Sequence, residues 1–146
     1  MKTKFQQLYM DWALRAAQMS YARRLQVGAV VVKDDTVISY GYNGMPAGWD
    51  NNCEFEYTNP QTKVTELVTR PEVLHAERNA LDKLAKKGNV GGEDAYLFVT
   101  HSPCLECAKS IYAAGISSVF YKEDYRSQDG IYFLKACGVN IQKLST

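Results

Sequence analysis

Two short stretches carry side chains that could hold a metal ion and move protons. The first is His75-Ala76-Glu77, and the second is Pro103-Cys104-Leu105-Glu106-Cys107. One imidazole and two thiolates form a ligand set that suits Zn²⁺ and leaves a fourth position open for water. Zinc held by three protein ligands lowers the pKa of a bound water to about 7, and Glu77 would then be free to carry its proton. The stretches therefore predict hydrolysis at a zinc site formed by His75, Cys104 and Cys107. The amidine-like carbon of an aminated ring is a group that the zinc-activated water could attack.

Neither stretch identifies a zinc enzyme by itself. A lone C-x-x-C is as compatible with a redox pair as with a metal site, and a lone H-x-E carries almost no information. Together they favour the metal, because a thioredoxin-like redox pair has no use for His75 and Glu77. A purely structural zinc would need a fourth protein ligand. Cys53 is available for that role, so a non-catalytic, zinc-stabilised binding module is the alternative from a different class.

Both stretches fall where helices are predicted to begin. Residues 73–87 (VLHAERNALDKLAKK) have apolar side chains at helical spacing. A second helix is predicted to open at Ser102-Pro103, with serine as the N-cap and proline at the first position, and to stop at Gly115. The free N–H groups at a helix start stabilise thiolates. His75 and Glu77 would diverge along a regular helix, so we expect them to converge in its first, incompletely helical turn.

The remaining pattern predicts an α/β fold. A helix is expected over 3–20, with an apolar stripe that faces the core and Thr3 as its N-cap. The stripe consists of Phe5, Leu8, Trp12, Ala16 and Met19. A β-hairpin is expected around Asp34-Asp35. The elements expected after residue 87 are a glycine-rich turn over 88–94, strands over 95–100, 116–121 and 139–144, and a helix over 127–137 that brings Cys137 into the core. Strands alternating with helices indicate a mixed, mostly parallel sheet between helical layers.

Two segments separate the hairpin from the first zinc stretch. The run Gly41-Tyr42-Asn43-Gly44-Met45-Pro46-Ala47-Gly48 cannot continue a strand, and its glycines allow the backbone to approach a ligand closely. Asn43 can donate and accept hydrogen bonds at once, although a turn that uses it only for its dihedral angles is the alternative. Residues 49–71 form a long polar insertion with one short strand or turn, which could cover the site or build an oligomer contact.

Length and composition bound the kind of protein. The 146 residues predict a single domain over 1–146. The formal net charge is +1, which does not provide the broad basic field of a nucleic-acid-binding protein and favours a small-molecule substrate. No apolar run approaches the roughly 18 residues of a membrane span, and the first residues lack the apolar centre of a signal peptide. We therefore expect an intracellular, cytoplasmic protein without a membrane or nucleic-acid partner.

The two zinc stretches also carry a family resemblance. His75-Ala76-Glu77-Arg78-Asn79-Ala80-Leu81 and Pro103-Cys104-Leu105-Glu106-Cys107-Ala108-Lys109 resemble the motifs of the cytidine deaminase superfamily. With Gln26-Val27-Gly28-Ala29 and the run from Gly41 to Gly48, the chain resembles the deoxycytidylate (dCMP) deaminase branch over residues 8–140. The resemblance implies a three-layer cytidine-deaminase-like fold with a five-stranded sheet. It also implies hydrolysis of dCMP to dUMP and ammonia for thymidylate synthesis, with one catalytic zinc and with Glu77 as the proton shuttle.

Nucleotide contacts follow from the same resemblance and from charge. Asn43 would hold the sugar, and the family places nucleotide or phosphate contacts at Gln26, Lys109 and Tyr125. Lys109 and Arg24 are the basic side chains we expect at the phosphate. Further basic candidates are Arg23, Lys122 and Arg126.

Regulation and assembly are implied by the resemblance alone. Many family members are hexamers that dCTP activates and dTTP inhibits, with Mg²⁺ on the regulatory nucleotide. The regulatory site lies in a loop near a subunit interface, which corresponds here to Asn43 and Gly44. A phage-encoded member would act in the host cytoplasm.

Other branches of the superfamily fit less well. The tRNA adenosine deaminases share both zinc motifs but would be expected to carry a basic surface for RNA, which a net charge of +1 does not support. Free cytidine deaminases usually have cysteine where His75 stands. Some phage dCMP deaminases bind a second zinc through a cysteine before the first strand. The corresponding residues here, 21–24 (YARR), include no cysteine, so Cys53 is left without the rest of such a site.

Overall fold

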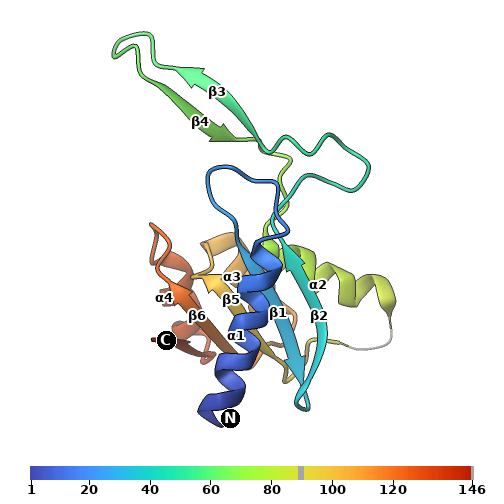
Figure 1. The fold of residues 1–146 in the computed structure, drawn as a ribbon. Coiled ribbons are helices and arrows are strands. Elements are labelled where there is room, and N and C mark those ends of the chain that lie inside the picture. The colour runs from blue at the N-terminus through green and yellow to red at the C-terminus, as the bar shows by residue number, and fades with distance from the viewer. Residues whose placement is uncertain (89–90, 146) are drawn as a thin grey trace.

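The computed structural model describes residues 1–88 and 91–145, so residues 89 and 90 of the predicted turn over 88–94 lie outside the described part. The described residues form four helices and seven strands (Figure 1). The helices are α1 (Thr3–Ala17), α2 (Ala76–Lys87), α3 (Leu105–Ala113) and α4 (Asp129–Ala136). The strands are β1 (Gly28–Lys33), β2 (Thr36–Tyr42), β3 (Glu54–Thr58), β4 (Thr65–Thr69), β5 (Tyr96–His101), β6 (Ser118–Glu123) and β7 (Asn140–Lys143).

Five strands form one mixed sheet in the order β2-β1-β5-β6-β7. β1 is antiparallel to both of its neighbours, whereas β5, β6 and β7 run parallel. The predicted α/β class with a five-stranded mixed sheet is therefore confirmed. The expectation of a mostly parallel sheet is wrong, because the hairpin formed by β1 and β2 joins the sheet through an antiparallel β1–β5 pair.

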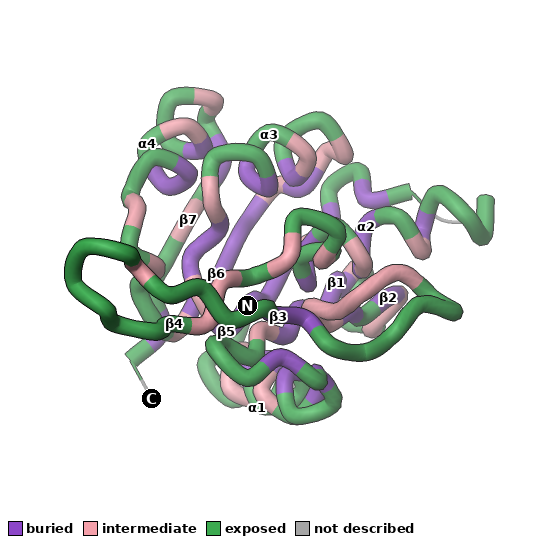
Figure 2. The backbone as a smooth tube through the Cα atoms, turned by 90° about the horizontal axis from the view of Figure 1, so that it is seen from above, coloured by how far each residue is buried: buried purple, intermediate pink, exposed green. Residues whose placement is uncertain are grey.

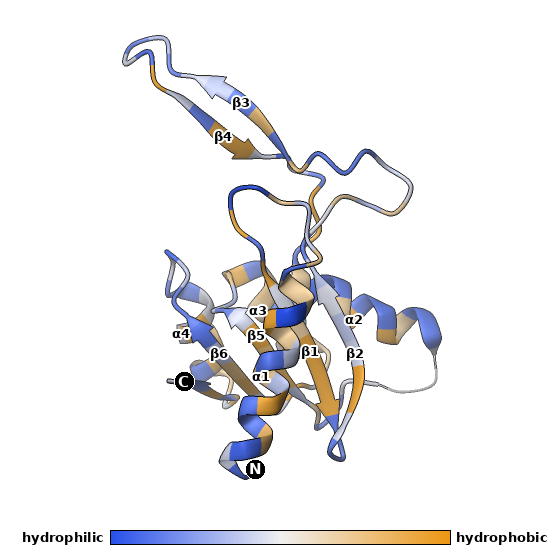
Figure 3. Cartoon of the chain, in the orientation of Figure 1, coloured by the Kyte–Doolittle hydropathy of each residue, from blue (hydrophilic) through white to orange (hydrophobic). Residues whose placement is uncertain are grey.

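Helices cover both faces of this sheet and make a three-layer domain. Along β1, Val30 and Val32 pack in a cluster with residues of α1, while Val31 packs in a second cluster with residues of α2, α3 and α4. This alternation follows from the two-residue side-chain period of a strand. Much of the length of β1, β5 and β6 is buried (Figure 2), and β1 and β6 carry strongly hydrophobic colouring (Figure 3).

Helix α1 presents a different face to the sheet from the one predicted. Leu8, Trp12 and Met19 of the expected stripe are exposed, and the helix ends at Ala17 rather than residue 20. The side chains that face the sheet are Tyr9, Met10, Ala13, Ala16 and Ala17. A Cβ added to Gly28 would lie 2.0 Å from the Ala13 carbonyl oxygen. Because β1 and α1 approach so closely at Gly28, only small side chains such as those of Ala13 and Ala17 fit at that point. The predicted cap is also absent, since Lys2 occupies the N-cap position without a side-chain hydrogen bond.

The insertion over 49–71 forms a two-stranded hairpin instead of one short strand or turn. β3 and β4 pair antiparallel, from Glu54 opposite Thr69 to Thr58 opposite Thr65. The hairpin projects away from the main sheet and is attached at its base (Figure 1). Phe55 is among its exposed side chains.

The two stretches with the predicted zinc ligands lie at helix starts as predicted, with shifted boundaries. α2 begins at Ala76, so His75 rather than an earlier residue is its N-cap. α3 begins at Leu105 with Cys104 as N-cap, so the predicted cap at Ser102 is wrong. Cys137 is half-buried rather than fully buried. Among the described residues, no helix combines the length and apolarity needed to cross a bilayer.

Candidate active site

The N-termini of α2 and α3 meet at one point and bring three metal-ligating side chains together. His75 and Cys104 are the N-cap residues of these helices, and both have extended backbones, with φ −72°, ψ 155° and φ −70°, ψ 169°. Cys107 lies in the first turn of α3, and its N–H donates to Sγ of Cys104 at 3.5 Å. Because His75 is a cap residue with an extended backbone, its side chain does not follow the helical periodicity that would point it away from Glu77.

The three predicted zinc ligands have the spacing of one coordination shell. Nδ1 of His75 lies 3.2 Å from Sγ of Cys107 and 3.6 Å from Sγ of Cys104. The three ligand atoms all lie within 4.8 Å of one another. A tetrahedral zinc with Zn–N and Zn–S bonds of about 2.0 and 2.3 Å needs N···S separations of about 3.6 Å. The donor atoms therefore fit a zinc ion, with one tetrahedral position left for water.

Charge at this cluster already favours a thiolate. Hydrogen bonds from Cys107 and His75 lower the pKa of Cys104 to about 4. The hydrogen bond with Cys104 raises the pKa of His75, and the same thiolate together with burial raises the pKa of Cys107. Protons at His75 and Cys107 must leave when the metal binds, so metal affinity is coupled to pH.

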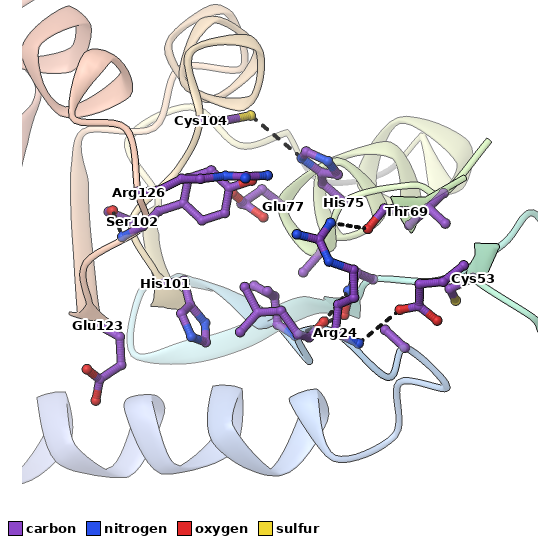
Figure 4. A pocket seen from close by; sticks show the side chains of 18 of the residues that line it. Arg24, Cys53, Thr69, His75, Glu77, His101, Ser102, Cys104, Glu123 and Arg126 are labelled. Atoms are coloured by element: carbon purple, nitrogen blue, oxygen red, sulfur yellow. Dashed lines mark hydrogen bonds between the residues drawn. The ribbon is translucent and has the colours of Figure 1, made fainter. Parts of the chain in front are cut away.

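Glu77 is held in the protein interior beside this cluster. It is 4% exposed, lies in the first turn of α2 and lines the same cavity as His75 (Figure 4). Burial raises the pKa of Glu77 to about 7. A carboxyl group that titrates near neutral pH can both accept and return a proton, which is what general acid–base catalysis requires.

A cavity of about 830 Å³ lies beside the cluster of predicted zinc ligands. This volume is within the usual range for small-molecule sites. Its walls come from the link before β1, the GYNG loop (residues 41–44, at and after the end of β2), the base of the β3–β4 hairpin, the starts of α2 and α3, and the segment after β6 (Figure 4). The polar and charged residues that line it are Arg24, Asn43, Cys53, Glu54, Thr69, His75, Glu77, His101, Ser102, Cys104, Glu123, Asp124, Tyr125 and Arg126.

The expected nucleotide contacts divide into two groups. Arg24, Asn43 and Tyr125 line the cavity. Gln26 and Lys109 are not among its lining residues. The Gln26 amide donates to the Ser20 carbonyl oxygen at 2.8 Å, and Lys109 Nζ donates to the Glu106 carboxylate at 3.2 Å.

The Asn43 side chain makes two hydrogen bonds to the backbone that the sequence did not predict. Its Oδ1 accepts the Val27 N–H at 2.9 Å, and its Nδ2 donates to the Leu25 carbonyl oxygen at 2.8 Å. The side chain thereby fixes the link that carries Arg24, while one lone pair and one amide hydrogen remain for a ligand. Asn43 and Gly44 also line a second, smaller cavity of about 300 Å³.

Several lining residues were not anticipated. His101 Nδ1 and Thr100 Oγ1 form a hydrogen bond at 2.9 Å, and burial lowers the pKa of His101. Ser102 Oγ accepts the Tyr125 N–H at 2.7 Å and fixes the segment that carries Arg126. The sequence could have indicated His101 and Ser102 as lining residues, because they directly precede P-C-x-x-C. It contained no such indication for Glu54 and Thr69, because their positions depend on the hairpin that was not predicted.

Cys53 does not belong to the cluster of predicted zinc ligands. The three clustered ligands of the described residues are His75, Cys104 and Cys107, and the Cys53 thiol donates to the Asn51 carbonyl oxygen at 3.5 Å. Burial raises the pKa of Cys53, which favours its thiol form. The four-ligand structural zinc considered from the sequence therefore lacks its fourth ligand in this arrangement.

In this structure, two helices begin side by side next to a mixed sheet, and their first residues carry three possible zinc ligands and a buried glutamate. This combination is typical of the zinc-dependent nucleobase deaminases. Residues 3–123 match the profile of the cytidine and deoxycytidylate deaminase zinc-binding region. The chain belongs to this family.

Similar proteins agree with that placement. The chain is 38% identical over 121 residues to a deoxycytidylate deaminase of Mycobacterium phage D29, covering 80% of this chain and 92% of the relative. It is 36% identical over 130 residues to ComE operon protein 2 of Bacillus subtilis, covering 86% of this chain but only 63% of that longer relative. The crystal structure of a dCMP deaminase from the cyanophage S-TIM5 in complex with dCMP and dUMP has a TM-score of 0.88 and 40% identity, covering 99% of both chains.

Proposed function

We propose that this protein hydrolyses dCMP to dUMP and ammonia. The observation that carries the proposal is a single cavity lined by two of the three zinc ligands, His75 and Cys104, by Glu77, and by Arg24 and Arg126. Such a cavity suits a substrate with an aminated base and an anionic group. The similarity to a phage dCMP deaminase crystallised with dCMP and dUMP supports the same substrate. The product would supply thymidylate synthesis.

The reaction requires a nucleophilic water and a group that moves its protons. When bound by His75, Cys104 and Cys107, zinc supplies an activated water at neutral pH. Glu77 accepts one water proton and delivers it to N3 of the cytosine ring as oxygen bonds to C4. Glu77 then carries the remaining proton from that oxygen to the amino group, which leaves as ammonia when the C4–N bond breaks. Water and dCMP thus become dUMP and ammonia, and Glu77 ends in its starting protonation state.

The rest of the nucleotide would extend from the metal cluster toward the two arginines. Arg24 and Arg126 offer planar guanidinium groups that match phosphate oxygens. The Arg126 guanidinium carbon lies 5.7 Å from the centre of the Tyr125 ring, which is a cation–π distance. Tyr125 would therefore hold Arg126 in place at the cavity wall. Asn43, with its free hydrogen-bonding positions, would contact the sugar.

A comparison of substrates tests the proposal. Ammonia release and loss of cytosine absorbance should be measured for dCMP, deoxycytidine, dCTP and a tRNA anticodon loop under the same conditions. We expect dCMP to be turned over with the highest kcat/KM. Preferred turnover of deoxycytidine would refute the monophosphate assignment, and preferred turnover of the RNA would place the protein with the tRNA deaminases. A zinc-stabilised binding module would bind metal and release no ammonia from any of them.

We also propose that dCTP with Mg²⁺ activates the enzyme and that dTTP inhibits it through the GYNG loop. The cavity of about 300 Å³ that Asn43 and Gly44 line supports a second nucleotide site. Since Asn43 lines both cavities, a nucleotide in the smaller one can alter the link that carries Arg24. Rates measured over a range of dCMP concentrations should rise at low dCMP when dCTP is added and fall with dTTP. Unchanged rates with either nucleotide would refute this regulation.

Assembly of several copies, as a hexamer, completes the proposal. Leu8 and Trp12 on α1 and Met19 just after it are 50%, 45% and 51% exposed and would lose contact with water in an interface. Phe55 and Tyr57 on the projecting hairpin are further exposed apolar side chains. Large exposed apolar surfaces of this kind favour protein–protein contacts.

A further inference from the structure

Glu54, the first residue of β3, is a buried carboxylate at the wall of the active-site cavity. Its side chain is 1% exposed. Oε2 accepts the backbone N–H groups of Arg23 and Arg24 at 2.9 and 3.0 Å, and Oε1 accepts Nε of Arg23 at 3.3 Å. A buried charge needs such partners to offset its lost hydration. All of these partners belong to the two-arginine segment before β1.

The residue opposite Glu54 in the hairpin holds the other end of Arg24. Glu54 pairs with Thr69 across β3 and β4, so the two side chains lie on the same face of the hairpin. Nη1 of Arg24 donates to Oγ1 of Thr69 at 3.1 Å (Figure 4). One cross-strand pair therefore fixes both the backbone and the guanidinium group of Arg24. Glu54, Thr69 and Arg24 all line the cavity that contains Glu77.

We propose that Glu54 is a positioning residue for phosphate recognition, which acts by holding Arg24 against the base of the β3–β4 hairpin. The inference rests on the proposed function, because it assigns to Arg24 the 5′-phosphate of the nucleotide. A guanidinium group binds a phosphate most effectively when its orientation is fixed before the ligand arrives. The hairpin thus has a role at the active site although most of it projects away from the domain.

The carboxylate charge, rather than the shape of the side chain, is needed for this role. A glutamine at position 54 can still accept N–H groups through its single oxygen. Its NH₂ group, however, would replace the oxygen that accepts from Nε of Arg23 and would face that donor. The expected result is a loosened segment and a misplaced Arg24 guanidinium, with the zinc ligands and Glu77 unaffected.

Steady-state kinetics of Glu54→Gln test the inference. We expect KM for dCMP to rise about tenfold, close to the loss of one charge-assisted hydrogen bond, while kcat at saturating dCMP stays within about twofold. The matched control is Glu56→Gln, two residues along β3, where the carboxylate is exposed and makes no hydrogen bond or ion pair with any described residue. It should leave KM and kcat unchanged. Thr69→Val removes the other hold on Arg24 and should raise KM in the same way.

A double variant separates positioning from general stabilisation. If Glu54 acts through Arg24, then Glu54→Gln should add little to the KM increase of Arg24→Ala. A KM for Glu54→Gln within twofold of wild type would overturn the inference, as would a fall in kcat equal to the KM effect or fully additive effects in the double variant. If Glu54→Gln does not fold, Thr69→Val and its combination with Arg24→Ala decide the question by the same criteria. Failure of the wild-type protein to convert dCMP would instead refute the proposed function.

Discussion

Nδ1 of His75 lies 3.2 Å from Sγ of Cys107, although 32 residues separate them in the chain. The contact exists because the N-terminus of α2 faces that of α3. Replacing Cys107 by alanine leaves two ligands, which is one fewer than a catalytic zinc site uses. We expect Cys107→Ala to lose most of its zinc, measured by elemental mass spectrometry. Turnover should fall by more than the about 10- to 100-fold that outer-shell partners of a metal carry.

Cys137→Ala is the matched control for that experiment. Cys137 follows α4 and is also a free, half-buried thiol, but it does not belong to the metal cluster of the described residues. Its variant should keep about one zinc ion per chain. Retention of a full zinc complement by Cys107→Ala would mean that other groups hold the metal.

Glu77 should be essential for turnover and dispensable for metal binding. Its burial raises its pKa to about 7, and an amide in its place cannot carry a proton. We expect Glu77→Gln to lower kcat by about 10²- to 10⁴-fold, the usual contribution of general acid–base catalysis. Zinc content and the thermal unfolding midpoint should match wild type. Glu106→Gln, in the first turn of α3 and 77% exposed, controls for loss of a carboxylate near the site. Full activity of Glu77→Gln would require a different proton carrier.

Arg126 should contribute to binding of the phosphate. It lines the cavity next to Tyr125, whereas Lys109 is paired with Glu106 on the surface of α3. We expect Arg126→Ala to raise KM for dCMP about 10- to 100-fold, as for a lost hydrogen bond to a charged group, with a smaller change in kcat. The exposed Lys135 in the last turn of α4 provides the control Lys135→Ala. A KM increase in Lys109→Ala but not in Arg126→Ala would place the phosphate along α3 instead.

Glu54 should make the stability of the protein depend on pH in acid. Burial opposes its ionisation, but hydrogen bonds from the Arg24 and Arg23 N–H groups and the Arg23 guanidinium lower its pKa below the ordinary value of 4.5. A lowered native pKa contributes stability that is present above the unfolded pKa and is lost as pH falls through the native pKa. The difference in free energy of unfolding between wild type and Glu54→Gln should therefore be constant from pH 7 to about 5 and shrink below about 4.5. Urea unfolding at each pH measures it, and a difference that does not change with pH would contradict the native ion pair.

The chemistry was more predictable from sequence than the walls of the cavity. His75 and the C-x-x-C pair are local signals, since their residue types and their positions at helix starts are both readable from the chain. Glu54 reaches Arg23 across 31 positions, and only the folded hairpin brings the two together. The face of α1 was mispredicted for a related reason. Hydrophobic periodicity selected Leu8 and Trp12, but the close approach at Gly28 turns the side of the helix with Ala13 and Ala17 toward the strand.

The exposed stripe on α1 should mediate self-association. Leu8 and Trp12 lie one turn apart on the exposed side of α1, Met19 follows just after the end of the helix, and each is about half exposed. We expect the wild-type protein to be larger than one chain by light scattering at micromolar concentration, and Trp12→Glu to shift the mass toward the monomer because a charge cannot be buried there without a partner. The circular dichroism spectrum should be unchanged. Tyr132→Glu, on α4 across the sheet and at a residue 63% exposed, is the control and should keep the assembled mass. A monomeric wild-type protein would refute assembly, and dissociation by Tyr132→Glu alone would move the interface to the opposite face.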